Sequence, residues 1–306
     1  MKKKFKSGYV AFLGKPNVGK STLLNHFLKE KLCIISPKPQ TTRDSIQGIL
    51  SEPGYQIIFV DTPGIHQPKT ALGKHMNDLA QDAGIDADVM ILIVDASTGI
   101  TYEDRQIFNW LKSKYKAIEN KRVMILINKI DLIEKNEVLP IIAKCQRELA
   151  QIKISDYIPV SAIDGDNLDL IFGKMLEYLP FGPVYYPEDQ LTDKNERYVV
   201  AELIREQVLG CCREEVPHSV AVLVQAMQDN PGRKTLIQAT VYVEKKTQKG
   251  IIIGEKGQML KTIGSLAREQ IEGFLGRKVY LELWVRVQDN WRKDEAFLKK
   301  LGYGDK

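Results

Sequence analysis

The sequence predicts a doubly wound α/β domain with a mostly parallel sheet, followed by a small α+β domain. Over residues 1–180, short β-branched runs alternate with amphipathic stretches, which is the pattern of a parallel sheet covered by helices. A Pro/Gly cluster then interrupts the pattern, and the order of elements changes beyond it. The length of 306 residues fits two domains of roughly 100–200 residues each.

Five short runs of the first domain are predicted to be buried strands, because they are nearly continuous in apolar character. They span residues 9–13, 56–60, 89–94, 123–127 and 157–160. Amphipathic segments between them are predicted to be helices, including 20–29, 102–114, 137–151 and 168–178.

The first domain is predicted to cover residues 1–180, with a linker over 181–193 and a second domain over 194–306. The linker contains Phe181-Gly182-Pro183 and a further proline at 187. The second domain is predicted to contain a helix (about 195–212), two strands (219–228 and 235–243), a helix (258–275), a strand (279–287) and a short final helix near Trp291. Two successive strands do not continue the first architecture.

Composition excludes several classes of protein. With 43% hydrophobic and 27% charged residues, the chain is too apolar to be disordered. The longest apolar run, 89–94, is far shorter than the roughly 18–20 residues that span a bilayer, and the basic start MKKKFK is not followed by the apolar stretch of a signal peptide. The four cysteines have no metal-ligand spacing, so we expect reduced thiols in the cytoplasm.

Charge is unevenly distributed along the chain. Residues 233–306 contain 16 Lys and Arg against nine Asp and Glu, whereas 181–232 contain four against nine. A basic C-terminal region favours a polyanionic partner. A solvated Lys-rich surface is the alternative explanation of the same pattern.

A phosphate-binding loop is predicted between the first strand and the first helix. The segment fits G-x-x-x-x-G-K-[ST], in which backbone N–H groups and the helix N-terminus face phosphates. Its residues are Gly14, Lys15, Pro16, Asn17, Val18, Gly19, Lys20 and Ser21. Lys20 is expected to reach the β- and γ-phosphates, and Ser21 to offer its hydroxyl to Mg²⁺.

A base-reading motif follows the fourth strand and favours guanine. Asn128, Lys129, Ile130 and Asp131 lie where open α/β sheets bind ligands. The Asp131 carboxylate can accept from N1–H and the N2 amino group of guanine, whereas adenine offers neither donor there. Ser161 and Ala162, after the fifth strand, are expected to contact the base through their backbone.

The second strand is followed by Asp61, Thr62, Pro63, Gly64 and Ile65. Asp61 is placed to hold Mg²⁺, and the Gly64 N–H to sense the γ-phosphate. Either Thr41 or Thr42 should complete the Mg²⁺ shell, with Thr42 as the assigned ligand.

Taken in order, these elements resemble the translation-factor-related GTPases, and PNVGKSTLLN, QTTRD and DTPGI look like the Era branch. The resemblance covers essentially the whole chain. It implies a GTP-hydrolysing switch that binds the 3′ end of small-subunit ribosomal RNA and assists assembly of the 30S subunit. It also implies a monomer in the cytoplasm, with peripheral association at the inner face of the cell membrane as a further expectation.

The hydrolytic machinery is expected to use Lys20, Asn17, Thr42 and Gly64. Many GTPases carry a glutamine after this motif that orients the attacking water, but Ile65 has no polar atom, so intrinsic turnover should be slow. His66 is next in the chain and is more often a bystander than a base. In related GTPases an asparagine at the position of Asn17 helps to hold K⁺; a polar turn residue is the alternative role.

The second domain resembles a type II KH domain, in which an I-I-G-x-x-G segment approaches the backbone of about four unpaired nucleotides. The residues assigned to RNA binding are Ile253, Gly254, Glu255, Lys256, Gly257, Lys261 and Arg286. Tyr280 and Trp284 share a strand face with Arg286, and Trp284 fits either a core or a groove position. Trp291 is expected to pack internally.

Other functions fit the sequence less well. A metabolic P-loop kinase would not require the N-K-x-D motif or a KH domain. A tRNA-modification GTPase would need a different domain arrangement, and a double-GTPase assembly factor a second P-loop. A pure RNA-binding protein with an inactive GTPase domain is disfavoured by intact Lys20, Ser21, Asp61 and Asp131.

Overall fold

The computed structural model describes residues 5–36, 38, 41–68, 70–212, 215–229 and 234–303. The chain forms two compact units. The first contains most residues up to Asp193, and the second begins at Lys194 and also includes short segments around 34–36 and 70–72.

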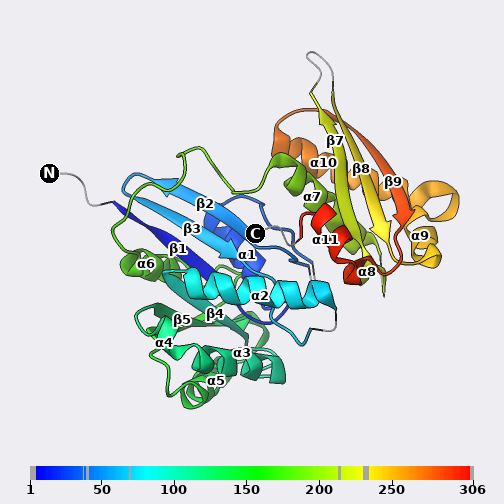
Figure 1. The fold of residues 1–306 in the computed structure, drawn as a ribbon. Helices are drawn as coiled ribbons and strands as arrows, with labels where there is room; N and C mark the ends of the chain where they lie inside the picture. Colours follow the sequence, from blue (N-terminus) through cyan, green and yellow to red (C-terminus); the bar gives the residue numbers. More distant parts are fainter. Residues whose placement is uncertain are drawn as a thin grey trace. The chain divides into compact units, whose positions relative to one another are not determined.

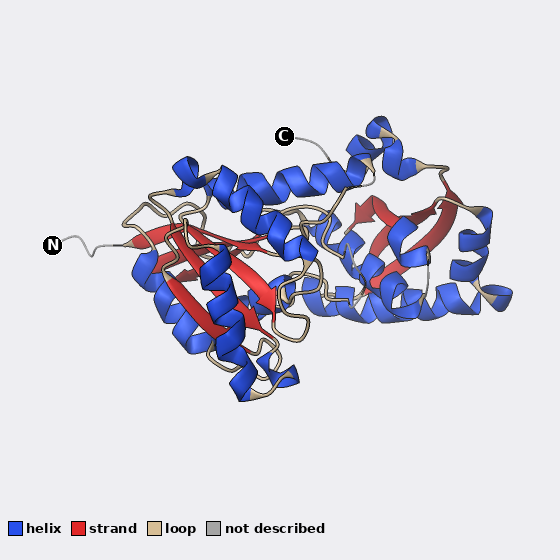
Figure 2. Ribbon diagram, turned by 90° about the horizontal axis from the view of Figure 1, so that it is seen from below, coloured by secondary structure: helices blue, strands red, loops and turns tan. Residues whose placement is uncertain are grey.

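A six-stranded sheet forms the centre of the first unit (Figures 1 and 2). Its order is β2-β3-β1-β4-β5-β6, and all neighbouring strands are parallel except β2 and β3. The strands are β1 (Lys6–Leu13), β2 (Ile46–Glu52), β3 (Tyr55–Asp61), β4 (Val89–Asp95), β5 (Arg122–Asn128) and β6 (Asp156–Val160). This confirms the predicted doubly wound, mostly parallel domain.

Helices connect the strands: α1 (Lys20–Leu28), α2 (Ala71–Asp86), α3 (Tyr102–Ser113), α4 (Tyr115–Ile118), the 3₁₀ turn η1 (Ile130–Leu132), α5 (Lys135–Glu148) and α6 (Leu168–Tyr178). One face of the sheet packs through stacked rings of β1, β3, α1 and α6, namely Phe12, Phe59, Phe27 and Phe172. A larger apolar cluster joins β4 and β5 to α2, α3 and α5, with Met90, Ile125, Ala80, Phe108 and Cys145 among its members. These two layers hold the carboxyl ends of the parallel strands at one edge.

Four elements of this unit were not predicted, namely β2, α2, α4 and η1. The β2 strand lies at the sheet edge and contains Gly48, where a Cβ would collide with the Leu28 side chain. Its register is set by pairing with β3, from Ile46 opposite Asp61 to Glu52 opposite Tyr55. The apolar period of β2 is too weak to identify the strand without its partner.

The segment predicted as a linker lies against the first unit. The buried Gln56 side chain accepts from the N–H groups of Tyr185 and Tyr186 and donates to the Tyr186 carbonyl oxygen. Thr192 forms an isolated bridge with Gly48. The segment is therefore held by backbone and side-chain hydrogen bonds over much of its length.

The second unit has a three-stranded sheet of order β7-β8-β9, in which β7 and β8 are antiparallel and β8 and β9 parallel. Its elements are α7 (Glu196–Cys211), α8 (Val216–Ser219), β7 (Ala221–Gln228), β8 (Thr235–Val243), α9 (Lys246–Ile253), η2 (Glu255–Gly257), α10 (Gln258–Leu275), β9 (Val279–Val287), η3 (Trp291–Lys293) and α11 (Glu295–Lys300). The small α+β domain is confirmed, with α9 as an additional helix before the Gly-rich turn.

Trp291 is fully buried, and its indole Nε1–H donates to the Ser219 carbonyl oxygen at 2.8 Å. This agrees with the expected packing role. None of the four cysteines forms a disulfide. No helix of the described residues is both long and apolar enough to cross a bilayer.

Candidate nucleotide-binding and RNA-binding sites

The predicted phosphate-binding loop joins β1 to α1 in the structure. Gly19 caps α1 with a left-handed φ of 102°, and a side chain there would collide with Asn128 Nδ2. No side chain of the described residues caps this helix end. The first N–H groups of α1 therefore face the loop with the positive end of the helix dipole, as anion binding requires.

Lys20 is buried beneath this loop and points back across it. Its Nζ donates to the carbonyl oxygens of Gly14 at 3.2 Å and Lys15 at 3.0 Å. Burial lowers the pKa of Lys20 to about 8, although the nearby Asp61 carboxylate raises it. A poorly solvated ammonium in this position is suited to phosphate oxygens.

The three residues predicted to hold Mg²⁺ come together. Ser21 Oγ donates to Asp61 Oδ2 at 2.7 Å and lies 3.1 Å from Thr42 Oγ1, which also donates to Asp61 Oδ2 at 3.2 Å. Asp61 Oδ1 is buried without a hydrogen-bond partner among the described residues. Burial raises the pKa of Asp61, while Lys20 and the two hydroxyl donors lower it.

Two hydroxyl oxygens and a buried carboxylate form the hard oxygen set that Mg²⁺ prefers. The unpartnered Asp61 oxygen gives such an ion a buried negative charge to neutralise. The residues present therefore fit a magnesium site, which would supply charge neutralisation for the phosphates.

The base-reading residues form one hydrogen-bonded group at the ends of β5 and β6. Asn128 donates from Nδ2 to the Val18 carbonyl oxygen at 2.6 Å and accepts at Oδ1 from the Ala162 N–H at 3.0 Å. Asp131, in η1, accepts from the Ser161 hydroxyl at 2.7 Å. Ser161 thus contributes its side chain, whereas only a backbone contact was predicted for it.

Several residues assigned to nucleotide binding have structural partners. The Thr62 hydroxyl donates to the Phe12 carbonyl oxygen at 2.6 Å, and Ile65 is buried in the apolar core. Gly64 lies so close to Pro16 that a Cβ would be 2.5 Å from the Pro16 backbone nitrogen. The side chains of Thr62 and Ile65 are therefore engaged within the fold, and the Ile65 N–H donates to the Gly14 carbonyl oxygen at 3.1 Å.

His66 is held against its own loop through one ring nitrogen and its backbone. Its Nδ1 lies 2.9 Å from the Gly64 carbonyl oxygen. Its backbone is held at both ends by the Asn77 side chain, which accepts from the His66 N–H and donates to the His66 carbonyl oxygen.

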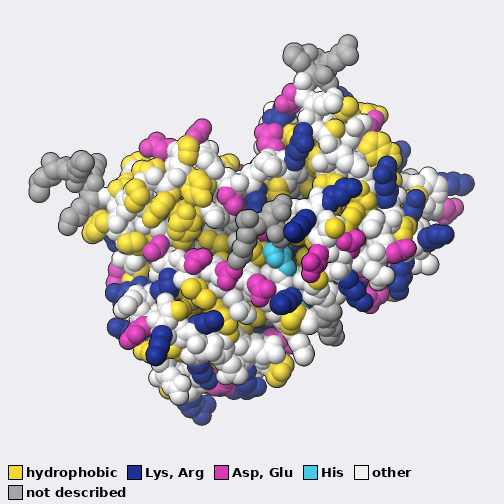
Figure 3. Space-filling model, in the orientation of Figure 1, with side chains coloured by type: hydrophobic (Ala, Val, Ile, Leu, Met, Phe, Trp, Pro, Cys, Tyr) yellow, Lys and Arg dark blue, Asp and Glu magenta, His cyan; other side chains and the backbone are white. Residues whose placement is uncertain are grey.

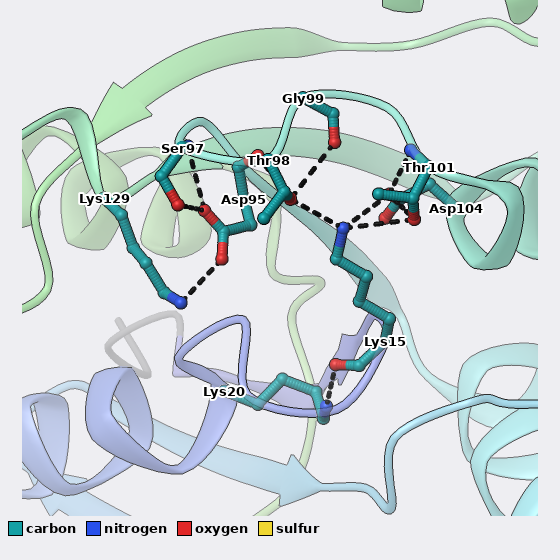
Figure 4. A network of polar contacts seen from close by, with 9 residues as sticks. All are labelled: Lys15, Lys20, Asp95, Ser97, Thr98, Gly99, Thr101, Asp104 and Lys129. Carbon is teal, nitrogen blue, oxygen red and sulfur yellow. Dashed lines mark hydrogen bonds and ion pairs between the residues drawn. The ribbon is translucent and has the colours of Figure 1, made fainter. Parts of the chain in front are cut away.

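Lys15 and Lys129 direct their side chains to carboxylates of the protein (Figure 4). Lys15 Nζ lies 2.8 Å from Asp104 Oδ2, and Lys129 Nζ lies 2.6 Å from Asp95 Oδ2. The assignment of Lys15 to nucleotide binding is therefore restricted to its backbone.

The Gly-rich turn of the second unit has a backbone conformation that lets another backbone approach it closely. Gly254, Lys256 and Gly257 have positive φ angles of 71°, 48° and 80°. A Cβ at Gly254 would lie 2.6 Å from the Met259 Cβ. The side chains of Glu255 and Lys256 are exposed at the tip of this turn.

A groove extends from this turn between α10 and the edge strand β9. It brings together the predicted residues Gly257 and Lys261 with Arg268, Tyr280 and Leu283. Tyr280 is 56% exposed, so its ring is available for stacking. Trp284 is 42% exposed, so the structure excludes the core position that the sequence left open for it.

The remaining predicted RNA residues, Ile253 and Arg286, line a second depression together with Lys246 and Lys249 of α9. Figure 3 shows Lys and Arg side chains spread over this part of the second unit. Lys246, Lys249 and Arg268 line these depressions but were not among the residues predicted to bind RNA. The helical spacing of 246 and 249 would have identified the first two had α9 been predicted.

Comparison with protein families matches residues 9–129 to the 50S ribosome-binding GTPase family and residues 215–292 to the KH domain. The chain is 49% identical over 300 residues to the GTPase Era of Lacticaseibacillus paracasei, covering 98% of this chain and 97% of that protein. It is 45% identical over 299 residues to the GTPase Era of Halothermothrix orenii, covering 98% and 99%.

Two solved structures are similar over 98% of this chain and 99% of theirs, each at 42% identity. One is Era in complex with MgGDPNP and nucleotides 1506–1542 of 16S ribosomal RNA, with a TM-score of 0.92. The other is a variant of Aquifex aeolicus Era bound to GDP and AlF₄⁻, with a TM-score of 0.91. With a P-loop GTPase unit, a KH unit and full-length relatives far above 30% identity, the chain belongs to the Era family of GTPases.

Proposed function

We propose that this chain is a GTP-hydrolysing switch whose second unit binds single-stranded RNA at the 3′ end of small-subunit ribosomal RNA, and that it assists assembly of the 30S subunit. The observation that carries the first part is the convergence of Ser21, Thr42 and Asp61 beside Lys20. In P-loop GTPases, residues in these roles hold Mg²⁺ and the γ-phosphate.

Guanine selection is assigned to Asp131, whose carboxylate is exposed and fixed by Ser161. GTP is expected to place N1–H and the N2 amino group against this carboxylate. The Gly64 N–H and the Thr42 hydroxyl are proposed to respond to the γ-phosphate. Without a glutamine after Gly64, and with Ile65 buried, intrinsic hydrolysis should be slow.

RNA binding is assigned to the turn at 254–257 and the groove with Lys261 and Tyr280. Backbone approach at the glycines, a positive side chain and an exposed ring are what a KH module offers to unpaired bases. The similar solved complex with nucleotides 1506–1542 of 16S ribosomal RNA supports this choice of RNA.

Further expectations rest on the family resemblance. Asn17, exposed in the phosphate-binding loop, is proposed to help to hold K⁺ beside the phosphates. A monomer in the cytoplasm, with peripheral association at the inner face of the cell membrane, is the expected state of the protein.

Crosslinking of the full chain in cell extract, with GTP or GDP added, followed by sequencing of the bound RNA, tests the proposal. We expect enrichment of the 3′ end of small-subunit ribosomal RNA, with more crosslinks in GTP. A charge-reversed turn, Glu255→Asp with Lys256→Asp, should lose the crosslinks. The matched control Lys299→Asp, on the exposed face of α11, should keep them. Enrichment of other RNA by the unaltered chain would refute the choice of RNA.

A further inference from the structure

The loop between β4 and α3, residues 96–101, contains none of the nucleotide-binding motifs but is attached to two of them (Figure 4). On one side it meets the second residue of the phosphate-binding loop, Lys15. On the other side, Asp95 at the end of β4 accepts from Ser97 of the loop and pairs with Lys129 of the base-reading motif. These attachments suggest a role for the loop in nucleotide binding that the motifs themselves do not describe.

The Lys15 side chain is nearly enclosed, with 11% of its surface exposed, and its Nζ has three oxygen partners. They are Thr98 Oγ1 at 2.9 Å, Thr101 Oγ1 at 3.2 Å and Asp104 Oδ2 at 2.8 Å. All three belong to the 96–101 loop or the first turn of α3. An ammonium with this many partners is held in one position.

Asp104 is itself fixed. Its Oδ2 also accepts from the Thr101 N–H at 2.8 Å and the Thr101 hydroxyl at 2.7 Å, which forms a capping box at the start of α3. The helix N-terminus stabilises the carboxylate, and the side chain is 1% exposed. The anchor for Lys15 is therefore a rigid part of the fold.

The backbone of Lys15 links this anchored side chain to the phosphate site. Its carbonyl oxygen is one of the two acceptors of Lys20 Nζ, at 3.0 Å. The side chain of Lys15 thus fixes the peptide group whose carbonyl oxygen accepts a hydrogen bond from Lys20.

The other end of the loop is tied to the base-reading motif. Asp95 accepts from Lys129 Nζ at 2.6 Å and from the Ser97 N–H at 2.9 Å. The Ala96 N–H donates to the Asn128 carbonyl oxygen at 2.8 Å. Asn128 in turn bonds to the Val18 carbonyl oxygen, so the contacts close a ring through the phosphate-binding loop.

We propose that Asp104 and Lys15 are positioning residues of the nucleotide site: their ion pair braces the phosphate-binding loop against the 96–101 loop and thereby slows nucleotide release. The inference rests on the proposed nucleotide-binding role of the loop. Neither side chain touches the ligand in this scheme. Their effect passes through the Lys15 peptide to Lys20.

The test measures the rate at which fluorescently labelled GDP dissociates from the full-length protein with Mg²⁺ present. Lys15→Met and Asp104→Asn should each speed GDP dissociation at least tenfold. Lys15→Arg keeps the positive charge, so its dissociation rate should lie close to that of the unaltered protein. The preference for GTP over xanthosine triphosphate should not change, because Asp131 and Ser161 are intact. The matched control is Arg105→Met. Arg105 lies on α3, as Asp104 does, and forms an ion pair with Glu148 of α5 that is outside the ring of contacts. Its loss should leave the rate of GDP dissociation unchanged.

A buried ion pair broken on one side can unfold a domain, so a second variant separates stability from positioning. Lys15→Met with Asp104→Leu removes both charges and leaves no unpaired one. Positioning would be supported if this variant released GDP fast and had an unfolding temperature near that of the unaltered protein. Release within twofold of the unaltered rate would overturn it. Failure of the unaltered protein to bind GDP would instead refute the proposed nucleotide site.

Discussion

The Ser161 hydroxyl donates a 2.7 Å hydrogen bond to Oδ1 of Asp131, and Ser161 is fully buried whereas Asp131 is exposed. Ser161 Oγ also accepts from the Asp164 N–H at 3.0 Å, so its position is fixed from two sides. A carboxylate oxygen can accept more than one hydrogen bond, and the remaining lone pairs of Asp131 are open to the ligand. The base-reading carboxylate is therefore oriented before guanine arrives.

Replacement of Asp131 with Asn should weaken GTP binding and shift the preference towards xanthosine nucleotides. An amide presents a donor to the N2 amino group of guanine, whereas the C2 oxygen of xanthine can accept from it. We expect a loss for GTP of about 2–3 kcal/mol, or roughly 30–150-fold. Competition binding with GTP and xanthosine triphosphate measures both effects.

Ser161→Ala provides the matched control for this change. It should weaken GTP binding by about 1 kcal/mol, because the carboxylate loses one orienting donor, but it should keep the preference for guanine. Equal GTP affinities of Asp131→Asn and the unaltered protein would show that Asp131 does not read the base.

The motifs that follow buried strands were predictable, because the carboxyl ends of parallel strands bring Lys20, Asp61 and Asp131 to one edge. The Ser161 side chain was not, since its partner is 30 residues away and the hydrogen bond depends on the register of β5 and β6. The same holds for Lys15, whose partner Asp104 is 89 residues away. Local patterns identify which residues meet the ligand, but not which residues hold them.

The helix α9 was missed for a related reason. The segment of α9 ends in Gly250 and three successive isoleucines, so its apolar period is obscured and only Gln248 and Ile252 are buried. Tertiary contacts with β8 and β9 decide its conformation. Its two lysines, 246 and 249, were consequently not assigned to a common surface.

Potassium should accelerate hydrolysis if Asn17 helps to bind it. GTP turnover should be faster in KCl than in NaCl at equal ionic strength, and Asn17→Ala should remove the difference. Asn17 has a left-handed φ of 63°, which strains alanine but not glycine. Asn17→Gly therefore removes the side chain without strain and should behave in the same way. Equal rates of the unaltered protein in the two salts would leave Asn17 as a turn residue.

Burial of Lys20 predicts how the stability of the nucleotide-free protein depends on pH. The folded pKa of about 8 lies below the unfolded value of 10.5, so the unfolded chain binds more protons between these values. Stability should therefore rise as pH increases from about 8 to 10.5. Lys20→Met should be more stable than the unaltered protein at pH 7 by roughly 1–3 kcal/mol, and this gain should shrink at pH 9.5.

Denaturant unfolding without nucleotide or Mg²⁺, at pH 7 and pH 9.5, measures this difference. Bound nucleotide should reverse the effect, since phosphate favours the charged ammonium, and Lys20→Met should then be the less stable protein. A constant difference between the two proteins at both pH values would contradict the assignment of a lowered pKa to Lys20.

RNA binding should be separable from nucleotide binding. A fragment of residues 190–306 contains the α7-to-α11 elements with their own buried core, so we expect it to fold and to bind single-stranded RNA. Affinity should fall as salt increases, because phosphate contacts release counterions.

In the full chain, Glu255→Asp with Lys256→Asp should abolish RNA binding through like-charge repulsion and leave GTP affinity unchanged. Filter binding with Lys299→Asp as the charge-matched control distinguishes a local effect from net charge. RNA binding by the altered turn at unaltered affinity would exclude it from the interface.

The two activities should be coupled only in the intact chain. Thr42 already contacts Ser21 and Asp61, and Gly64 lies against Pro16, so a γ-phosphate with Mg²⁺ would order both segments around 42 and 64. If this ordering changes what the second unit can dock against, RNA affinity should differ between a GTP analogue and GDP. Thermodynamic linkage then requires RNA to raise the affinity for the GTP analogue by the same factor.

Titration of each ligand with and without the other measures both factors. Thr42→Ala, which removes one hydroxyl from the magnesium group, should reduce both factors together. Identical RNA affinities with the GTP analogue, GDP and no nucleotide would refute the switch, whereas the separate GTP-binding and RNA-binding activities would stand, because they depend on Asp131 and on the turn at 254–257.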